Sequence, residues 1–346
     1  MGATAPNFIT GWGSPAAQAC YASLRMDGSR HGPQGDFAQL SSAMARTREA
    51  VAAKIRGKDQ IIDLALISMV AGGHLLLEDI PGVGKSTLAR ALAEAIGGEF
   101  RRIQFTSDLL PADLVGVNVW RASDERFEFR PGPLFANLVL ADEINRAPPR
   151  TQSALLEAMG EHQVSVDGHS RALPDPFTVL ATQNPVEHHG TYPLPESQRD
   201  RFLLRVRMGY AAPEVEAALL AAGGAARSGP VEPVLTLDQL RAAQAHARAV
   251  FVHDDLATYA QKIVQATREH ASVTLGVSTR GALAWVAAAR AKAYLDGREQ
   301  VQIDDLQDLA VASLAHRLMT STTGGDSSAI SEELIRDIVA RQPVPV

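Results

Sequence analysis

The amino-acid sequence predicts an α/β protein with a mostly parallel sheet, followed by a small all-helical domain. Short apolar runs alternate with helical patterns between residues 59 and 206, which is typical of a parallel sheet covered by helices on both faces. A Gly-rich turn joins the first of these runs to a helix at residues 79–87. Beyond a stretch with Gly and Pro at 221–233, every periodic segment has helical spacing.

The first half of the chain contains the expected strands. Residues 1–38, rich in Gly, Ala, Ser and Pro, read as a disordered tail, and helical spacing follows at 40–56 and 59–71. Five short apolar runs predict core strands at 74–78, 100–105, 138–141, 177–181 and 202–206. Helices are expected at 87–96 and 151–159, and hairpins pairing 116–120 with 126–130 and 162–166 with 170–173.

The second half is expected to be helical. An Ala-rich helix at 211–220 leads into the linker, and the later helices are expected at 236–249, 253–269, 278–295, 303–313 and 331–341. The predicted domains are therefore an α/β domain at 39–212, a connecting helix and linker at 213–235, and a helical domain at 236–346.

Composition excludes several classes of protein. The chain has 346 residues, of which 46% are apolar, as in an ordinary globular protein. Because its net charge is −6, we do not expect it to bind the phosphates of a nucleic acid. The single Cys20 forms no intrachain disulfide, which fits a reducing compartment. No secretion signal is recognisable, and polar or Gly residues interrupt the most apolar stretch, 61–77. We therefore expect a cytoplasmic protein without membrane insertion.

The Gly-rich turn predicts a phosphate-binding loop. Backbone N–H groups at a helix N-terminus form a concave positive site, Lys85 can reach terminal phosphates, and the Ser86 hydroxyl can bind Mg²⁺. The strict pattern G-x-x-x-x-G-K-S/T has Gly where this chain has Asp79. The alternative is a Rossmann-like turn, which leaves the Lys-Ser pair unexplained. The residues expected around the polyphosphate are Asp79, Ile80, Pro81, Gly82, Val83, Gly84, Lys85, Ser86 and Thr87.

Polar side chains follow two further core strands. Asp142 and Glu143 end the third strand, where Asp142 would hold Mg²⁺ and Glu143 would polarise an attacking water. The ends of parallel strands meet at one edge, so these acids should lie beside Lys85 and Ser86. A solvated acidic turn is the alternative. Asn184 follows the fourth strand, where its amide can orient water, although Asn before Pro is also a common turn.

Two arginines are candidates for neutralising phosphoryl charge. Arg201 stands just before the fifth strand, and Arg280 opens a helix of the C-terminal domain. A guanidinium fork suits a transferring phosphoryl group better than an ammonium does. Spacing alone favours a surface salt bridge for each of them.

The chain resembles the MoxR family of AAA+ ATPases over roughly residues 40–320. The segments that carry the resemblance are LLLEDIPGVGKS (75–86), QFTSDLLPADLVG (104–116), FRPGPLF (129–135), ADEINRAPPRTQSALLEAM (141–159) and ATQNPVEHHGTYPLPESQRDRF (181–202). The family tolerates a residue other than Gly at the position of Asp79. Arg199 departs from the family, which has an apolar residue there.

The resemblance implies roles that spacing does not give. Lys85 and Ser86 match the Walker A motif, and Asp142 and Glu143 match Walker B. Asn184 matches sensor 1; Arg201 matches the arginine finger that acts on the neighbouring subunit; Arg280 matches sensor 2 on the helical lid. The implied fold is thus a P-loop NTPase of the AAA+ type with a five-stranded sheet and a lid. The implied assembly is a ring, usually a hexamer, and members often work with proteins carrying a von Willebrand factor A domain.

Two functions are consistent with these residues. The first is a chaperone-like ATPase that binds ATP and Mg²⁺ at a site shared between subunits and remodels or matures partner complexes. The second is a nucleotide-gated scaffold or regulator with slow turnover, which recruits a partner in its ATP state. A small-molecule kinase or GTPase is weaker, because the guanine motif Asn-Lys-x-Asp does not occur in the sequence.

Overall fold

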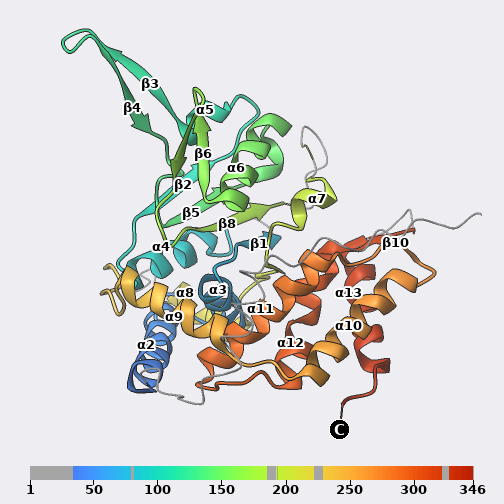
Figure 1. Ribbon diagram of the computed structural model, residues 1–346. Helices are drawn as coiled ribbons and strands as arrows, with labels where there is room; N and C mark the ends of the chain where they lie inside the picture. Colours follow the sequence, from blue (N-terminus) through green and yellow to red (C-terminus); the bar gives the residue numbers. More distant parts are fainter. Residues whose placement is uncertain are drawn as a thin grey trace, which may run out of the picture.

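The computed structural model of the chain describes residues 34–78, 82–184, 192, 194–221, 229–321 and 327–345. Its centre is a parallel sheet of five strands in the order β2-β5-β8-β1-β9 (Figure 1). The strands are β1 (Leu75–Glu78), β2 (Phe100–Gln104), β5 (Leu138–Asp142), β8 (Thr178–Gln183) and β9 (Leu204–Val206). All neighbouring pairs are parallel, which confirms the five predicted core strands and their mostly parallel arrangement.

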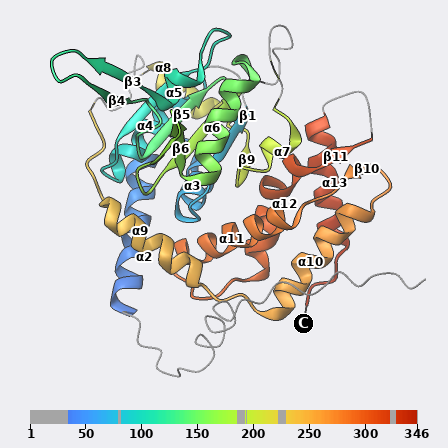
Figure 2. The same cartoon turned by 45° about the horizontal axis from the view of Figure 1, so that its top comes forward.

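Alternate residues of the inner strands β1, β5 and β8 pack into different cores. Leu75 and Leu77 of β1 join one core with the helices α2 (Gln34–Ala52), α3 (Asp59–Val70) and α4 (Lys85–Ala95). Leu76 joins a second core, which α6 (Pro149–Glu161) covers on the opposite face. Because both faces are buried at the centre of the sheet, the inner strands β1, β5 and β8 are largely apolar runs instead of alternating ones, whereas the edge strand β2 is mostly exposed. Figures 1 and 2 show helices on both sides of the sheet.

Two antiparallel hairpins extend from this layer, as predicted. They pair β3 (Gly116–Arg121) with β4 (Arg126–Pro131), and β6 (Gln163–Val166) with β7 (His169–Ala172). The β3–β4 hairpin, which follows the short helix α5 (Pro111–Val115), projects well beyond the body (Figure 1). Its first residue has φ +94°, and a Cβ there would lie 2.2 Å from the Arg130 carbonyl oxygen, so only Gly fits at Gly116.

The C-terminal part is a helical domain packed beside the sheet. Its helices are α9 (Leu237–Ala249), α10 (Asp254–Glu269), α11 (Thr279–Leu295), α12 (Ile303–Leu314) and α13 (Ser327–Arg341), with a 3₁₀ turn η2 (Ala315–Arg317). Trp285 at its centre is fully buried and donates its indole N–H to the Leu306 carbonyl at 2.9 Å. A short antiparallel pair of strands, β10 (Val273–Leu275) and β11 (Met319–Thr320), accompanies the helices. This pair was not predicted, because strands of two or three residues are too short to show a periodic pattern in the sequence.

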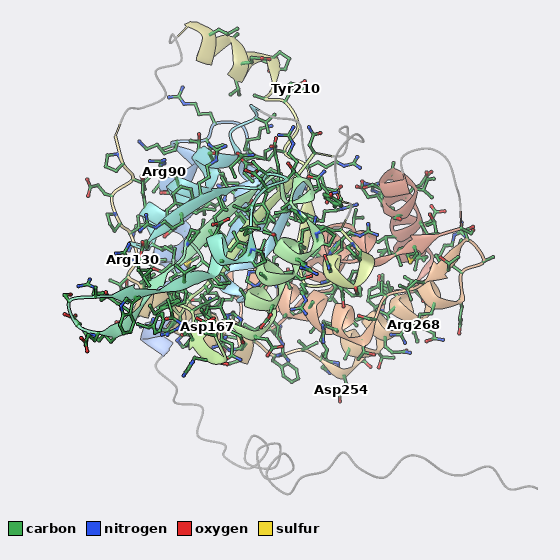
Figure 3. All side chains as sticks on the ribbon, turned by 90° about the horizontal axis from the view of Figure 1, so that it is seen from above. Arg90, Arg130, Asp167, Tyr210, Asp254 and Arg268 are labelled. Carbon is green, nitrogen blue, oxygen red and sulfur yellow. The ribbon has the colours of Figure 1, made fainter. Side chains whose placement is uncertain are left out.

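Some boundaries differ from the sequence expectation. Helix α2 begins at Gln34, so residues 34–38 of the expected tail are helical, while residues 1–33 lie outside the described part of the chain. Helix α8 (Pro213–Ala221) follows the exposed Tyr210 and lies at the rim of the molecule (Figure 3). Within the described ranges, no helix has both the length and the apolar character needed to cross a membrane.

Candidate nucleotide site

The described part of the predicted phosphate-binding loop runs from Gly82 into α4. Gly82 and Gly84 have φ of +88° and +99°, and a Cβ would meet nothing within 4 Å at either position. Glycine is therefore required here by backbone conformation and not by space. Lys85, Ser86 and the exposed Thr87 form the first turn of α4, whose N-terminal amides favour an anion. The predicted contacts Asp79, Ile80 and Pro81 lie outside the described residues.

The acidic pair lies at the carboxyl end of β5, as the sequence predicted. Asp142 is the last residue of the strand and is 9% exposed. Its Oδ1 accepts a hydrogen bond from the Thr182 hydroxyl at 2.6 Å, and its Oδ2 accepts from Arg102 Nη2 at 2.5 Å. One carboxylate oxygen therefore faces β8, the strand next to β1, and the other faces β2.

Glu143 has an uncommon backbone conformation. Its φ of 58° and ψ of 51° place a non-Gly residue in the left-handed region, at the start of the 3₁₀ turn η1 (Ile144–Arg146). Its amide donates to Thr182 Oγ1 at 2.8 Å, which ties the turn to β8. Its carboxylate accepts from Gln104 Nε2 at 2.7 Å and from Arg146 Nη1 at 3.0 Å. Strained backbone of this kind is concentrated at functional sites.

Three residues of this hydrogen-bond network were not predicted from the sequence. Arg102 and Gln104 lie on β2, and Thr182 lies on β8. The signal for the first two is that three of the five residues of the edge strand β2 are polar, whereas the neighbouring strand β5 is apolar up to Asp142. Gln104 is directly opposite Asp142 in the parallel register, which fixes its reach to the acidic pair. Thr182 carries no signal, because a single Thr is ordinary in a strand.

Asn184 lies where the sequence predicted, one residue beyond β8. Gln183 pairs with Glu78, the last residue of β1, so Asn184 lies at the same edge as the start of the phosphate-binding loop. Asn184 is 8% exposed, and its carbonyl accepts from Asn145 Nδ2 at 3.4 Å. The parallel topology therefore brings the ends of β1, β5 and β8, with their polar side chains, to one edge.

The two candidate arginines lie on different units. Arg201 follows the short helix α7 (Glu196–Arg199) and donates from Nη1 to the Leu156 carbonyl of α6. Arg280 is exposed in the first turn of α11 in the helical domain. Ser278 caps that helix by accepting from the Gly281 amide at 3.0 Å.

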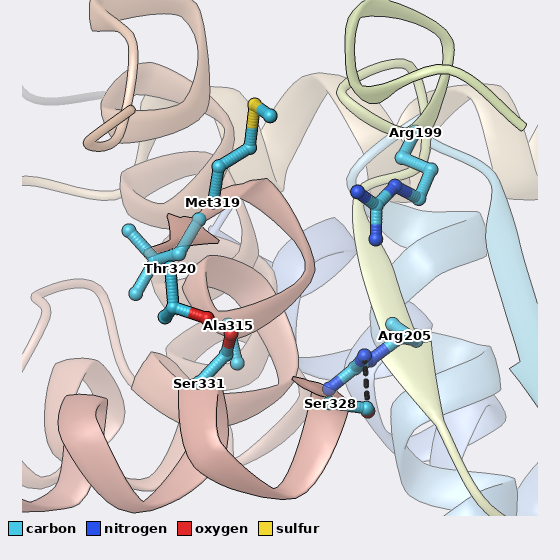
Figure 4. A pocket seen from close by; sticks show the side chains of 8 residues that line it. Arg199, Arg205, Ala315, Met319, Thr320, Ser328 and Ser331 are labelled. Carbon is cyan, nitrogen blue, oxygen red and sulfur yellow. Dashed lines mark hydrogen bonds between the residues drawn. The ribbon is translucent and has the colours of Figure 1, made fainter. Parts of the chain in front are cut away.

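A buried charge cluster supports the base of the phosphate-binding loop. Arg205 of β9 approaches Glu78 at 3.4 Å and Glu332 of α13 at 2.9 Å, and donates to Ser328 Oγ at 2.6 Å (Figure 4). Burial lowers the pKa of the Arg205 guanidinium, and the two carboxylates oppose that effect. Arg205 and Arg199 line a pocket of about 150 Å³ between β9 and α13.

Comparison with known proteins agrees with this geometry. Residues 74–204 match the family described as "ATPase family associated with various cellular activities (AAA)", and residues 265–338 match "AAA lid domain". The chain therefore has the fold of a P-loop AAA+ ATPase with a lid.

Individual relatives narrow the class. The YeaC protein of Bacillus subtilis is 49% identical over 293 residues, covering 84% of this chain and 91% of that one. Chaperone MoxR1 of Mycobacterium tuberculosis is 41% identical, covering 82% and 76%, and protein MoxR of Paracoccus denitrificans is 34% identical, covering 88% and 98%. A crystal structure from Cytophaga hutchinsonii matches with a TM-score of 0.81 at 32% identity, covering 90% and 97%. The chain belongs to the MoxR family of AAA+ ATPases.

Proposed function

We propose that this protein binds and hydrolyses ATP and uses the cycle to remodel or mature partner protein complexes. The observation that carries the proposal is the arrangement at one sheet edge. Asp142 and Glu143 lie at the end of β5, both hydrogen-bonded to Thr182, and the Gly-Lys-Ser turn follows β1, which flanks the same strand β8. Ligands of open parallel sheets bind at this edge.

Each residue of the site takes one role. The amides of the α4 N-terminus and Lys85 bind the phosphates, and Glu143 accepts a proton from the attacking water. Asn184 orients that water or contacts the terminal phosphate. Arg280 on the lid contacts the bound nucleotide, so that hydrolysis changes this contact and moves the lid against the sheet domain.

The oxygen donors of the site fit Mg²⁺. Ser86 and Asp142 would hold the ion, which supplies charge neutralisation on the phosphate oxygens. The described residues contain no cluster of three or more His, Cys, Asp or Glu that could hold a metal. Few protein ligands are typical of a Mg²⁺ that keeps several waters and binds substrate phosphates.

We further propose that the site is shared between subunits of a ring, most simply a hexamer. Arg201, which is partly exposed and bonds the Leu156 carbonyl of α6, then stabilises charge on ATP bound to the adjacent subunit. A von Willebrand factor A domain protein is the proposed partner, and the cytoplasm is the proposed location. In this scheme residues 39–212 bind the nucleotide, 213–235 connect, and 236–346 form the lid.

The first test replaces the proposed base. Glu143→Gln keeps the shape of the side chain and one acceptor oxygen for Gln104 and Arg146, but its amide cannot accept the proton. We expect ATP affinity to remain and turnover to fall by about 10²–10⁴-fold. Glu157→Gln on the exposed face of α6 is the matched control and should turn over at the wild-type rate. Unchanged turnover in Glu143→Gln would remove this residue from the mechanism.

The second test addresses the shared site. Arg201→Ala should bind ATP and hydrolyse it poorly, and Lys85→Ala should fail to bind. In mixed rings, Lys85→Ala subunits still carry an intact Arg201 and should restore turnover in an Arg201→Ala neighbour. Activity that only dilutes with the mixing ratio contradicts the shared site.

One observation favours the slow-turnover scaffold as the second candidate. Glu143 Oε2 accepts hydrogen bonds from both Gln104 and Arg146, so these two donors hold the carboxylate in place and restrain its movement toward an attacking water. Basal hydrolysis is then slow, and a partner that shifts β2 or η1 accelerates it. Gln104→Ala should raise turnover measured without a partner. A rate at or below that of the wild type contradicts this restraint.

A further inference from the structure

The lid forms hydrogen bonds with the residues on both sides of Arg201. Arg317 in the turn η2 donates from Nε to Asp200 Oδ1 at 2.7 Å and from Nη2 to the Phe202 carbonyl at 2.7 Å. Its Nη1 reaches the Leu203 carbonyl at 3.3 Å. Arg201 therefore lies between two residues that one lid guanidinium holds.

This contact is buried and specific. Arg317 is 5% exposed, and burial lowers the pKa of its guanidinium while the Asp200 carboxylate raises it. The neighbouring His316 is 1% exposed and bonds the same Phe202 carbonyl through Nε2 at 3.1 Å. A buried, planar guanidinium that donates to several acceptors fixes orientation as well as distance. The segment cannot shift relative to η2 without breaking several of these bonds.

The second oxygen of Asp200 bonds another lid element. The Ser278 hydroxyl donates to Asp200 Oδ2 at 3.2 Å and caps α11, in whose first turn Arg280 lies. A Cβ on Gly281 would lie 2.6 Å from Arg317 Cδ, so the start of α11 packs directly on the same guanidinium. Asp200 thus joins the helix that carries Arg280 to the segment that carries Arg201. Figures 1 and 2 both show α7, which ends just before this segment, beside the lid helices.

We propose that Asp200 is a positioning residue that couples the lid of one subunit to the arginine acting on its neighbour. The inference rests on the proposed function, since it assumes that Arg201 acts across the interface. When nucleotide moves the lid through Arg280, the carboxylate of Asp200 carries that movement to the backbone of Arg201. The state of one site then sets the rate at the next. Arg201 itself contributes the charge, and Asp200 determines where that charge lies.

Asp200→Asn tests the coupling with little change in volume. The variant keeps an acceptor for Arg317 but loses the charge that orients it. We expect turnover to fall roughly ten-fold while KM for ATP and the directly measured ATP affinity change by less than about two-fold. A purely structural role would instead weaken ATP binding together with the rate; the thermal midpoint does not separate the two, because Asp200→Asn leaves the buried Arg317 guanidinium without its charge partner. Turnover within about two-fold of wild type overturns the proposal.

Mixed rings separate action in trans from a local defect. Asp200→Asn subunits have a complete phosphate site, and Lys85→Ala subunits have an intact Asp200 and Arg201. The proposal predicts that adding Lys85→Ala subunits raises turnover per Asp200→Asn subunit. Failure of this rescue, when Arg201→Ala is rescued in the same assay, overturns the inference and leaves the proposed function standing. If Arg201→Ala alone turns over normally, the shared site itself fails.

Ser278→Ala provides a second variant that preserves the buried ion pair. It removes one bond to Asp200 and the cap of α11. The matched control is Thr236→Ala, which removes the cap of α9, where Thr236 accepts from the Gln239 amide at 3.2 Å. Both variants lose one N-cap, so any general loss of lid stability is shared. We expect a loss of turnover of at least about two-fold in Ser278→Ala relative to Thr236→Ala, and equal rates overturn the coupling.

Discussion

We predict that His74 makes the folding stability of the sheet domain sensitive to acid. It lies immediately before β1, is 3% exposed, and accepts the Val179 amide hydrogen on Nδ1 at 3.0 Å. Its Nε2 therefore carries the proton and donates to the Met159 carbonyl at 3.0 Å. The neutral ring satisfies both partners, whereas a protonated ring would turn a second N–H toward the Val179 amide. Burial, opposed by the Met159 bond and reinforced by nearby His162, lowers the His74 pKa to about 4.

The sign of the effect follows from where the proton binds. Above pH 6.5, the ordinary His pKa, the ring is neutral in both the folded and the unfolded chain, and His74 adds no pH dependence. Between pH 6.5 and about 4 only the unfolded chain takes up the proton, so stability falls as the pH falls. Each pKa unit is worth about 1.4 kcal/mol, so this residue removes up to about 3 kcal/mol across the window.

The assay is urea unfolding of wild type and His74→Gln at a series of pH values from 7.5 to 4.5. The Gln amide can donate to Met159 and accept from Val179, but it does not titrate. The difference in unfolding free energy between the two proteins isolates His74 from His316, whose pKa burial also lowers. We expect wild type to lose about 2 kcal/mol more than the variant between pH 6.5 and 5. Parallel curves over that interval would refute this account of His74.

Two further predictions concern the lid and α6. Asp305 is fully buried and forms ion pairs with Arg298 at 2.7 Å and with Lys292 at 3.1 Å. Asp305→Ala should therefore lower the free energy of unfolding, measured with urea, by about 3–5 kcal/mol, whereas Asp308→Ala at an exposed position should lower it by about 0–1 kcal/mol. A cost below 1 kcal/mol for Asp305→Ala would contradict its role as the centre of that cluster. A Cβ on Gly160 would lie 2.1 Å from Arg201 Nη1, so Gly160→Ala should displace the guanidinium and lower turnover while the thermal midpoint holds or rises. Wild-type turnover in this variant would show that the contact with α6 does not place Arg201.

The strands and the position of the acidic pair could be predicted from the sequence, because buried strands require runs of apolar residues. A strand such as LVLAD is apolar for four residues because both faces are covered, and the first polar residue marks the exposed edge. Parallel topology then brings such strand ends together, which is why Asp142, Asn184 and the Gly-Lys-Ser turn could be placed at one edge of the sheet. The short pair β10–β11 and the start of α2 at Gln34 left no comparable signal.

The partners of the acidic pair could not be predicted, because they depend on register. Arg102 reaches Asp142 across 40 residues of sequence, and Thr182 reaches it across another 40. A shift of one residue in either strand would turn these side chains to the opposite face and leave the composition unchanged. The left-handed backbone at Glu143 is equally invisible, since it results from the bond between its amide and Thr182 and not from a Gly.

The same reasoning explains why Arg201 looked like a surface residue from spacing alone. Its surroundings come from Leu156 on α6 and from Arg317, which lies 117 residues beyond Asp200 in another domain. Side chains that perform chemistry on phosphate have to lie at strand ends and helix starts, where the local pattern shows them. Side chains that set the position of those groups depend only on contacts in three dimensions, which leave no local sequence pattern. Asp200 is flanked by two arginines in a polar segment, and nothing in that segment predicts its bonds to the lid. Regulation of this site is therefore expected to involve residues that contact the lid, such as Asp200, more than the phosphate-binding residues themselves.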